Sequence, residues 1–236
     1  MIIDCVSDLH GYYPKLEGGD LLIVAGDLTA RDTEEEYTRI FDWMYGFVNY
    51  EKVIFIAGNH DNLIQKQKTF YGLSNPNLIL EILDNHPKKV EYLCDSGTEF
   101  KGLKIWGSPW TKTFPGMNPH CKAFTVDTEE ELAEKWALIP DDTDILITHG
   151  PPLVYFDRTI NNECVGSYTL CARVAEIEPI LHVFGHIHEC GGNILDRRTT
   201  TKHLPAFVDF SSTTFVNCSH VNERYQPVNK PIRIEL

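Results

Sequence analysis

The sequence predicts a layered α/β fold in which two β-sheets pack face to face with helices outside. Short, continuous apolar runs are typical of strands that are buried on both faces. Helical patterns precede several of these runs, as a layered α/β fold requires. A second set of short aromatic and β-branched segments, separated by turns, indicates further strands. The 236 residues and their ordinary globular composition are compatible with a single domain over residues 1–236.

Five apolar runs rich in Ile, Val and Leu predict the first group of strands. They cover residues 1–6, 21–25, 53–57, 145–148 and 180–184. A short polar signature follows each run: SDLHG at 7–11, GDL at 26–28, GNHD at 58–61, HGPP at 149–152 and GHIH at 185–188. Open α/β sheets place their sites beyond the carboxyl ends of their strands, so we expect one site assembled from all five loops.

Three helices are predicted between the strands. The first covers residues 32–48, with an acidic first turn and apolar residues at helical spacing on one face. The second begins at a capping box formed by Thr128 and Glu131 and ends at Pro140. The third begins at Ser167 and ends before residue 179. Each helix lies upstream of a strand that carries a signature, so we expect the helices to cover the sheets.

Six further segments are short, aromatic or β-branched, and we expect them to be antiparallel strands of a second sheet. They cover residues 89–93, 98–100, 103–106, 206–210, 213–217 and 232–236. The loop over residues 107–126 is rich in Pro, Gly and aromatic residues and is long enough to form a lid or a pocket wall. Its role, and the choice between core and pocket for Trp110, stay open at this point.

The bulk properties exclude several classes of protein. A formal net charge of -13 disfavours extended nucleic-acid binding, although bound cations would still permit a small anionic substrate. The N-terminus lacks a signal-peptide pattern and no apolar stretch approaches a membrane span, so we expect a cytoplasmic protein without a membrane segment. The seven cysteines form no Cys-x-x-Cys pair, which argues against a disulfide framework or a structural zinc site. The oligomeric state stays open, with a homodimer as one alternative.

Each polar signature has a structural alternative when it is taken alone. Asp27 is a suitable helix N-cap, and the residues 58–61 are compatible with a turn that precedes a helix. Taken together, the signatures contain five of the ten histidines, and all of them follow buried-looking strands. A mixture of imidazole, carboxylate and amide oxygen without thiolate suits Mn, Fe, Zn or Ni. The sequence therefore indicates a hydrolytic site with two metals.

In their order and residue pattern, the signatures resemble those of the calcineurin-like metallophosphoesterase superfamily, whose pattern is D-x-H, G-D, G-N-H-D/E, H and G-H-x-H. THGPPL at 148–153, HVFGHIHE at 182–189 and RYQPVNKPI at 224–232 are similar, more narrowly, to its metallophosphoesterase-domain-containing phosphodiesterase branch. The resemblance spans nearly the whole chain. It implies a four-layer α/β/β/α sandwich with two mixed β-sheets flanked by helices.

The resemblance also implies two divalent or transition metal ions, with Mn the first choice for assays in vitro. One ion would be held by Asp8, His10 and His188, a second by Asn59, His149 and His186, and Asp27 would bridge both. In the implied reaction, a hydroxide shared by the metals attacks a small phosphodiester, such as a cyclic or other nucleotide, in line with the leaving group. The implied catalytic residues are His60, the general acid, and Asp61, the partner that orients its ring.

Two other functions are compatible with these residues. A phosphomonoesterase would use the same metal site and differ only in pocket residues that the sequence does not identify. A non-catalytic binding or scaffold protein could retain the fold, although the presence of every ligand and of His60 argues against it. The H-x-H-x-D-H signature of metallo-β-lactamase-like hydrolases does not occur in the chain.

Overall fold

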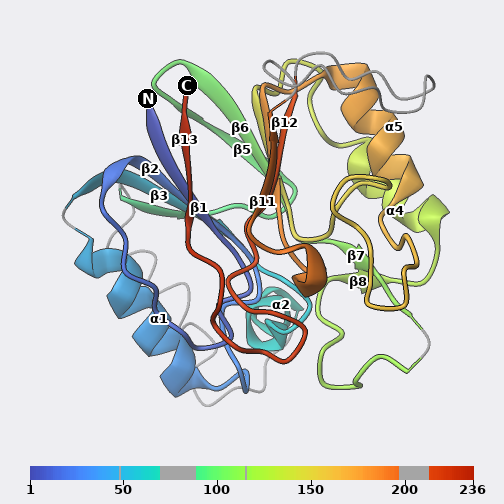
Figure 1. Cartoon of the computed structure of the whole chain (residues 1–236), viewed down its shortest axis with the longest axis horizontal. Helices are drawn as coiled ribbons and strands as arrows, with labels where there is room; N and C mark the ends of the chain where they lie inside the picture. Colours follow the sequence, from blue (N-terminus) through green and yellow to red (C-terminus); the bar gives the residue numbers. More distant parts are fainter. Residues whose placement is uncertain (48, 70–88, 115, 197–212) are drawn as a thin grey trace.

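A computed structural model describes the chain except for residues 48, 70–88, 115 and 197–212. Two sheets pack face to face and helices cover their outer faces, which confirms the predicted fold class (Figure 1). No helix in the described ranges has both the length and the apolar character needed to cross a bilayer.

The first sheet has the strand order β13-β1-β2-β3-β4. Its strands are β1 (Ile2–Val6), β2 (Gly19–Ala25), β3 (Tyr50–Ile56), β4 (Val90–Tyr92) and β13 (Ile232–Glu235). All neighbours are parallel except β13, which pairs antiparallel with β1. The signatures SDLHG, GDL and GNHD therefore leave the same edge of this sheet, after β1, β2 and β3.

The second sheet has the strand order β11-β12-β10-β9-β6-β5. Its strands are β5 (Ser96–Phe100), β6 (Leu103–Ser108), β9 (Ile145–Thr148), β10 (Leu181–Phe184), β11 (Asn193–Asp196) and β12 (Thr214–Asn217). The four inner strands are parallel, and β5 and β11 pair antiparallel at the two edges. A separate parallel pair, β7 (Thr111–Lys112) with β8 (Thr125–Val126), lies within the loop predicted over residues 107–126.

The predicted division of the strands between two sheets is partly wrong. Segments expected in one antiparallel sheet include β4 and β13, which belong to the first sheet. They also include β6 and β12, which pair in parallel with β9 and β10, respectively. The signature strands are also divided, because β9 and β10 lie in the second sheet. An apolar run shows that a strand is buried but does not identify its partner, which depends on contacts distant in sequence. The segment predicted over 206–210 lies outside the described residues.

Caps set the beginnings of the three predicted helices. Thr33 and Glu36 form a capping box before α1 (Glu34–Gly46), and the predicted box of Thr128 and Glu131 precedes α4 (Glu129–Trp136). Ser167 caps α5 (Tyr168–Ile177). A further helix, α2 (Asn62–Thr69), follows GNHD, where a helix was considered only as the structural alternative. A 3-10 turn, η1 (His188–Cys190), begins at the last residue of GHIH and was not predicted. Both are short, so their periodic pattern is weak.

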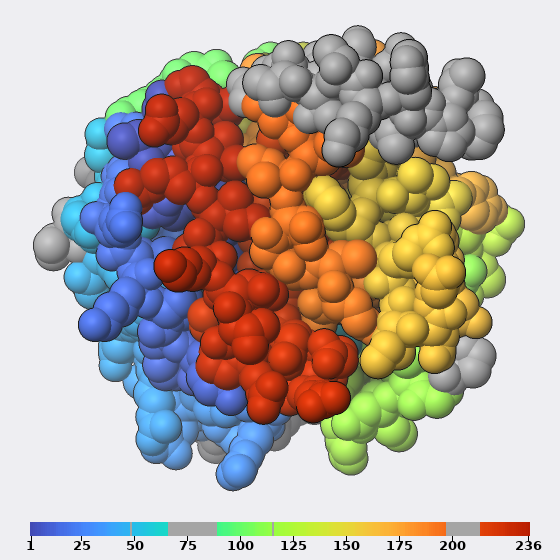
Figure 2. Space-filling view, viewed as in Figure 1, coloured from blue at the N-terminus to red at the C-terminus, as the bar shows by residue number. Residues whose placement is uncertain are grey.

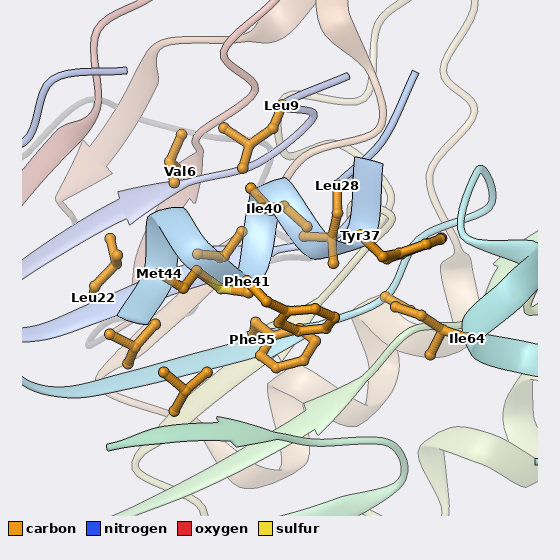
Figure 3. Packing of buried hydrophobic residues seen from close by; sticks show 14 of the residues in the cluster. Val6, Leu9, Leu22, Leu28, Tyr37, Ile40, Phe41, Met44, Phe55 and Ile64 are labelled. Atoms are coloured by element: carbon orange, nitrogen blue, oxygen red, sulfur yellow. The ribbon is translucent and has the colours of Figure 1, made fainter. Parts of the chain in front are cut away.

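Alternate residues of the strands pack into different layers. In β2, Leu21 and Ile23 face the second sheet, whereas Leu22 packs with the cluster under α1. Figure 3 shows Phe41 of α1 against Phe55, with Met44 near Leu22. In the second sheet, the inter-sheet layer contains mainly Ile and Val, and the outer layer packs against Trp136 of α4. Burial on both faces explains why these strands are continuously apolar.

We expect Ile147→Ala to lower the free energy of unfolding by about 2–5 kcal/mol, because Ile147 is fully buried between the sheets. The matched control is Ile160→Ala, whose side chain is 74% exposed and whose loss should cost no more than about 0.5 kcal/mol. Denaturant titrations followed by circular dichroism in EDTA would measure both values. Equal losses would contradict the packing of the inter-sheet layer.

Candidate metal centre

The five signatures converge where the carboxyl ends of strands from both sheets meet. The first sheet supplies the loops after β1, β2 and β3, and the second supplies those after β9 and β10. In Figure 1 the strands carrying these loops run toward the middle of the molecule, near α2. The expectation of one site from five loops is met, although two sheets rather than one contribute to it.

A first group of donors contains Asp8, His10, Asp27 and His188. One ligand atom from each lies within 4.8 Å of the others. Nε2 of His188 is 3.2 Å from Oδ1 of Asp8 and 3.4 Å from Nε2 of His10. Nε2 of His10 is 3.7 Å from Oδ2 of Asp27. Two carboxylates and two imidazoles thus face a common point.

A second group lies on the other side of Asp27. Nε2 of His149 is 3.1 Å from Oδ1 of Asn59 and 3.4 Å from Oδ1 of Asp27. The rings of His149 and His186 are 5.0 Å apart between centroids. Asp27 therefore presents one carboxylate oxygen to each group, and the seven predicted ligands form two adjacent sets that share it.

The charge of these groups fits cations. Asp8 is 0% exposed and Asp27 is 1% exposed. Among the described residues, their ion-pair partners are histidines alone, with no Lys or Arg. A buried carboxylate is costly unless positive charge and hydrogen bonds compensate it. Divalent cations bound by these donors would supply that charge, and the donor types suit transition metals.

The pKa values of the histidines reflect the same balance. Burial lowers the pKa of His10 to about 4, and burial together with the charge of His149 lowers that of His186 to about 3. These two rings are therefore neutral at pH 7 and free to act as ligands. Burial opposes protonation of His149 as well, but the adjacent Asp27 carboxylate raises its pKa to about 9. A bound cation would replace that proton.

Four of the candidate ligands adopt the left-handed backbone region. Their φ angles are 50° for Asp8, 42° for His10, 51° for Asp27 and 66° for His186. Non-glycine residues in this region cost about 1–3 kcal/mol each and persist only where surrounding contacts hold them. Backbone bonds from Asp8 to Gly26 and from His10 to Asp27 provide such contacts between the first two loops. Nothing in the local sequence pattern predicts these conformations.

Glycine is required at two of the signatures by close approach. A Cβ added at Gly58 would lie 2.3 Å from Oδ1 of Asp27. A Cβ added at Gly185 would lie 2.1 Å from Oδ2 of Asp8. Both distances are far inside van der Waals contact, so any side chain at these positions would displace a candidate ligand.

His60 lies at the edge of the two groups. Its Nε2 is 3.9 Å from Oδ2 of Asp27, and its side chain keeps 17% exposure. Its ring meets that of His10 edge to face with centroids 4.6 Å apart. On the other side of the ring, Nδ1 is 3.4 Å from Sγ of Cys121. Nε2 is thus the nitrogen that faces the site.

Asp61 differs from its expected position. It accepts hydrogen bonds from the backbone N–H of Gly58 at 2.8 Å and Leu28 at 3.1 Å, and from the Tyr37 hydroxyl at 3.1 Å. Within the described part of the chain, no hydrogen bond joins Asp61 to the His60 ring. Burial, with the charge of Asp27, raises the pKa of Asp61 to about 8. Asp61 therefore joins the loops after β2 and β3, because backbone donors there need a buried acceptor.

Two residues beside the site were not singled out from the sequence. Cys121, from the 107–126 loop, contacts His60 as described above, and its carbonyl accepts a hydrogen bond from Nδ2 of Asn59 at 3.1 Å. The ring of Tyr225 lies 4.8 Å from that of His10 and 5.1 Å from that of His188, between centroids. Tyr225 falls in the RYQPVNKPI segment, which was the available signal. Cys121 carries no local signal.

Two cavities meet at His60. The larger cavity has a volume of about 1040 Å³ and is lined by Asp27, Asn59, His60, His186 and His188. Some of the residues in the ranges 110–114, 117–121 and 150–170 also line it. Figure 2 shows the surface hollowed where the red C-terminal segment meets the orange, yellow and green segments. The smaller, of about 730 Å³, is lined by residues that include His10, Arg31, Asn62 and His120. The 107–126 loop thus forms a wall of both cavities.

Comparisons of sequence identify close relatives. The family model named calcineurin-like phosphoesterase matches residues 1–190. Metallophosphoesterase domain-containing protein 1 of Homo sapiens is 38% identical over 248 residues, covering 98% of this chain and 70% of that protein. UPF0046 protein K07C11.7 of Caenorhabditis elegans is 32% identical over 239 residues, covering 97% of this chain and 72% of that protein.

Solved structures share the fold. The protein TT1561 of Thermus thermophilus has a TM-score of 0.59 at 15% identity, covering 94% of this chain and 89% of that chain. Phosphopantetheinyl hydrolase of Mycobacterium tuberculosis has a TM-score of 0.54 at 15% identity, covering 98% of this chain and 95% of that chain. Because the family model and the relatives match most of the sequence, the chain belongs to the calcineurin-like phosphoesterase family of metal-dependent phosphoester hydrolases.

Proposed function

We propose that the protein is a phosphodiesterase that depends on two metal ions and hydrolyses small phosphodiesters. The observation that carries this proposal is the pair of donor groups that share Asp27, with His60 at their edge. Cyclic or other nucleotides are among the small diesters that such a site can take. The formal net charge of -13 supports small substrates over long nucleic acids.

The donor groups support an assignment of ligands. Asp8, His10 and His188 would hold one ion, and the second group of donors would hold the other. Asp27 would be shared, since its two oxygens face different groups. When bound, the two ions lower the pKa of a water molecule and neutralise charge on the phosphoryl oxygens. Manganese is the first metal to test, with Fe, Zn and Ni as alternatives. The second group consists of Asn59, His149 and His186.

The position of His60 supports a role in proton transfer rather than in metal binding. Its Nε2 faces the donor groups from 3.9 Å, whereas its Nδ1 is in contact with Cys121. Nε2 can therefore donate a proton to the oxygen of the departing group. General acid catalysis of this kind contributes about 10²–10⁴ in rate.

The two cavities that share His60 in their walls favour a diester over a monoester. A diester carries two substituents on its phosphate, and both must extend away from the two donor groups without steric clash. The cavities of about 1040 Å³ and 730 Å³ offer separate space for them, and His60 lines both. A monoesterase would need only one such space.

With Mn²⁺ we expect hydrolysis of bis-p-nitrophenyl phosphate with a kcat/KM at least tenfold above that for p-nitrophenyl phosphate. EDTA should abolish turnover and excess Mn²⁺ should restore it, because the donors need the ions. Release of p-nitrophenolate followed by absorbance measures both substrates. Turnover of the monoester alone would identify a monoesterase, and no turnover with Mn, Fe, Zn, Ni or Co would favour a scaffold.

Asp27→Asn should reduce metal content from two equivalents to one or fewer, because the shared carboxylate loses its charge. Elemental analysis of the purified protein after loading and desalting measures the content. The matched control is Asp42→Asn, an exposed position in α1, which should keep both ions. Full occupancy in Asp27→Asn would exclude the bridging role.

His60→Ala should leave both metals bound and slow hydrolysis of alkyl esters by about 10²–10⁴. Hydrolysis of p-nitrophenyl esters should be slowed far less, because p-nitrophenolate departs without a proton. Rates for a methyl p-nitrophenyl diester and for a dialkyl diester, measured on one preparation, give the comparison. Equal slowing of both substrates would remove His60 from the role of general acid.

A further inference from the structure

Several large apolar side chains around the larger cavity are exposed. Phe114 is 55% exposed, Ile160 74%, Val165 47% and Tyr168 52%, and all four line the cavity. They come from two segments that are distant in sequence, one between β7 and β8 and one before and at the start of α5. Clusters of exposed apolar side chains are costly in water and mark binding surfaces.

The apolar lining continues into the cavity. Leu132, Trp136 and Leu170 are almost fully buried, and they also line it. The candidate metal ligands Asn59 and His186 line the same cavity, so the apolar walls adjoin the position of the phosphate. A substituent on a bound phosphate would therefore enter an apolar space.

The charges on the walls restrict what that substituent can be. Apart from Asp27 and histidines, the described residues lining the cavity carry one cationic side chain, Lys112. The carboxylates are more numerous: Glu129, Glu163, Glu189 and Glu223. A second anionic group on the substrate would meet repulsion from these walls. A neutral group would not.

We propose that the larger cavity binds a neutral alkyl chain esterified to the phosphate, so that the preferred substrates are phosphodiesters with one apolar substituent. This inference rests on the proposed phosphodiesterase function, since the metal groups must hold the phosphate. Water leaves the exposed apolar side chains when the chain binds, and each buried methylene group strengthens binding by about threefold to fourfold.

The test is direct binding of alkyl phosphates to the Mn²⁺-loaded protein by isothermal titration calorimetry. Methyl, butyl and hexyl phosphate should show a dissociation constant that falls by about threefold to fourfold per methylene group. A 5-carboxypentyl phosphate, close in length to hexyl phosphate, should bind at least tenfold more weakly than hexyl phosphate. Equal affinities across the alkyl series would overturn the proposal, and so would equal affinity of the carboxylated ligand.

A double variant, Phe114→Asn with Ile160→Asn, tests the location. Both side chains are more than half exposed, so their replacement should leave the fold intact, which circular dichroism checks. We expect the ratio of hexyl to methyl affinity to fall by at least fivefold. The matched control is Leu138→Asn, which is 52% exposed but does not line the cavity and should keep the ratio. An unchanged ratio in the double variant would exclude this cavity.

The turnover and binding experiments distinguish failure of the phosphodiesterase proposal from failure of the cavity proposal. Dependence on chain length without turnover of bis-p-nitrophenyl phosphate would support the cavity and contradict the phosphodiesterase function. Turnover of that diester without dependence of affinity on chain length would support the phosphodiesterase function and contradict the proposed role of the cavity. Absence of turnover together with absence of binding by every alkyl phosphate would contradict both.

Discussion

The burial of the Asp27 carboxylate is the constraint on which the other features of the site depend. A carboxylate with 1% exposure requires donors and positive charge around it. The backbone N–H of His60 donates to it at 2.8 Å, and the rings of His10 and His149 face its two oxygens. Loops from both sheets must therefore meet at this carboxylate, and Gly58 must lack a side chain to permit it.

The strained loops that meet there are held by the rest of the fold. Positive φ angles at Asp8 and Asp27 are unfavourable in isolation. The strands before them are anchored by apolar contacts on both faces, and Asp61 joins the loops after β2 and β3 through backbone N–H groups. Tyr37 of α1 completes this network, so the helix that covers the sheet also supports the site. Stability and site geometry are thus coupled through the same residues.

The candidate metal ligands and the residues that would contact the rest of a substrate lie in different parts of the structure. The donors that would hold metal lie at strand ends, where the backbone is fixed by both sheets. The surfaces that would contact the rest of a substrate lie on connecting segments, including the 107–126 loop and residues 153–168. Such connecting segments vary in sequence and length more readily than strands do. Cys121 links the two parts, since it contacts His60 from the loop.

Local pattern was sufficient to predict most of the described strands, the capping box before α4 and the candidate donors, because burial, capping and polar signatures are properties of short stretches of chain. The capping box of Thr128 and the run before Asp27 are examples. Sheet membership, the backbone conformation at Asp8 and the partners of Asp61 depend on residues far away in sequence, which local pattern does not contain. The sequence alone thus determined which side chains are candidates for the metal centre. Their grouping around one shared carboxylate, and the apolar cavity beside it, arise only when the two sheets pack together.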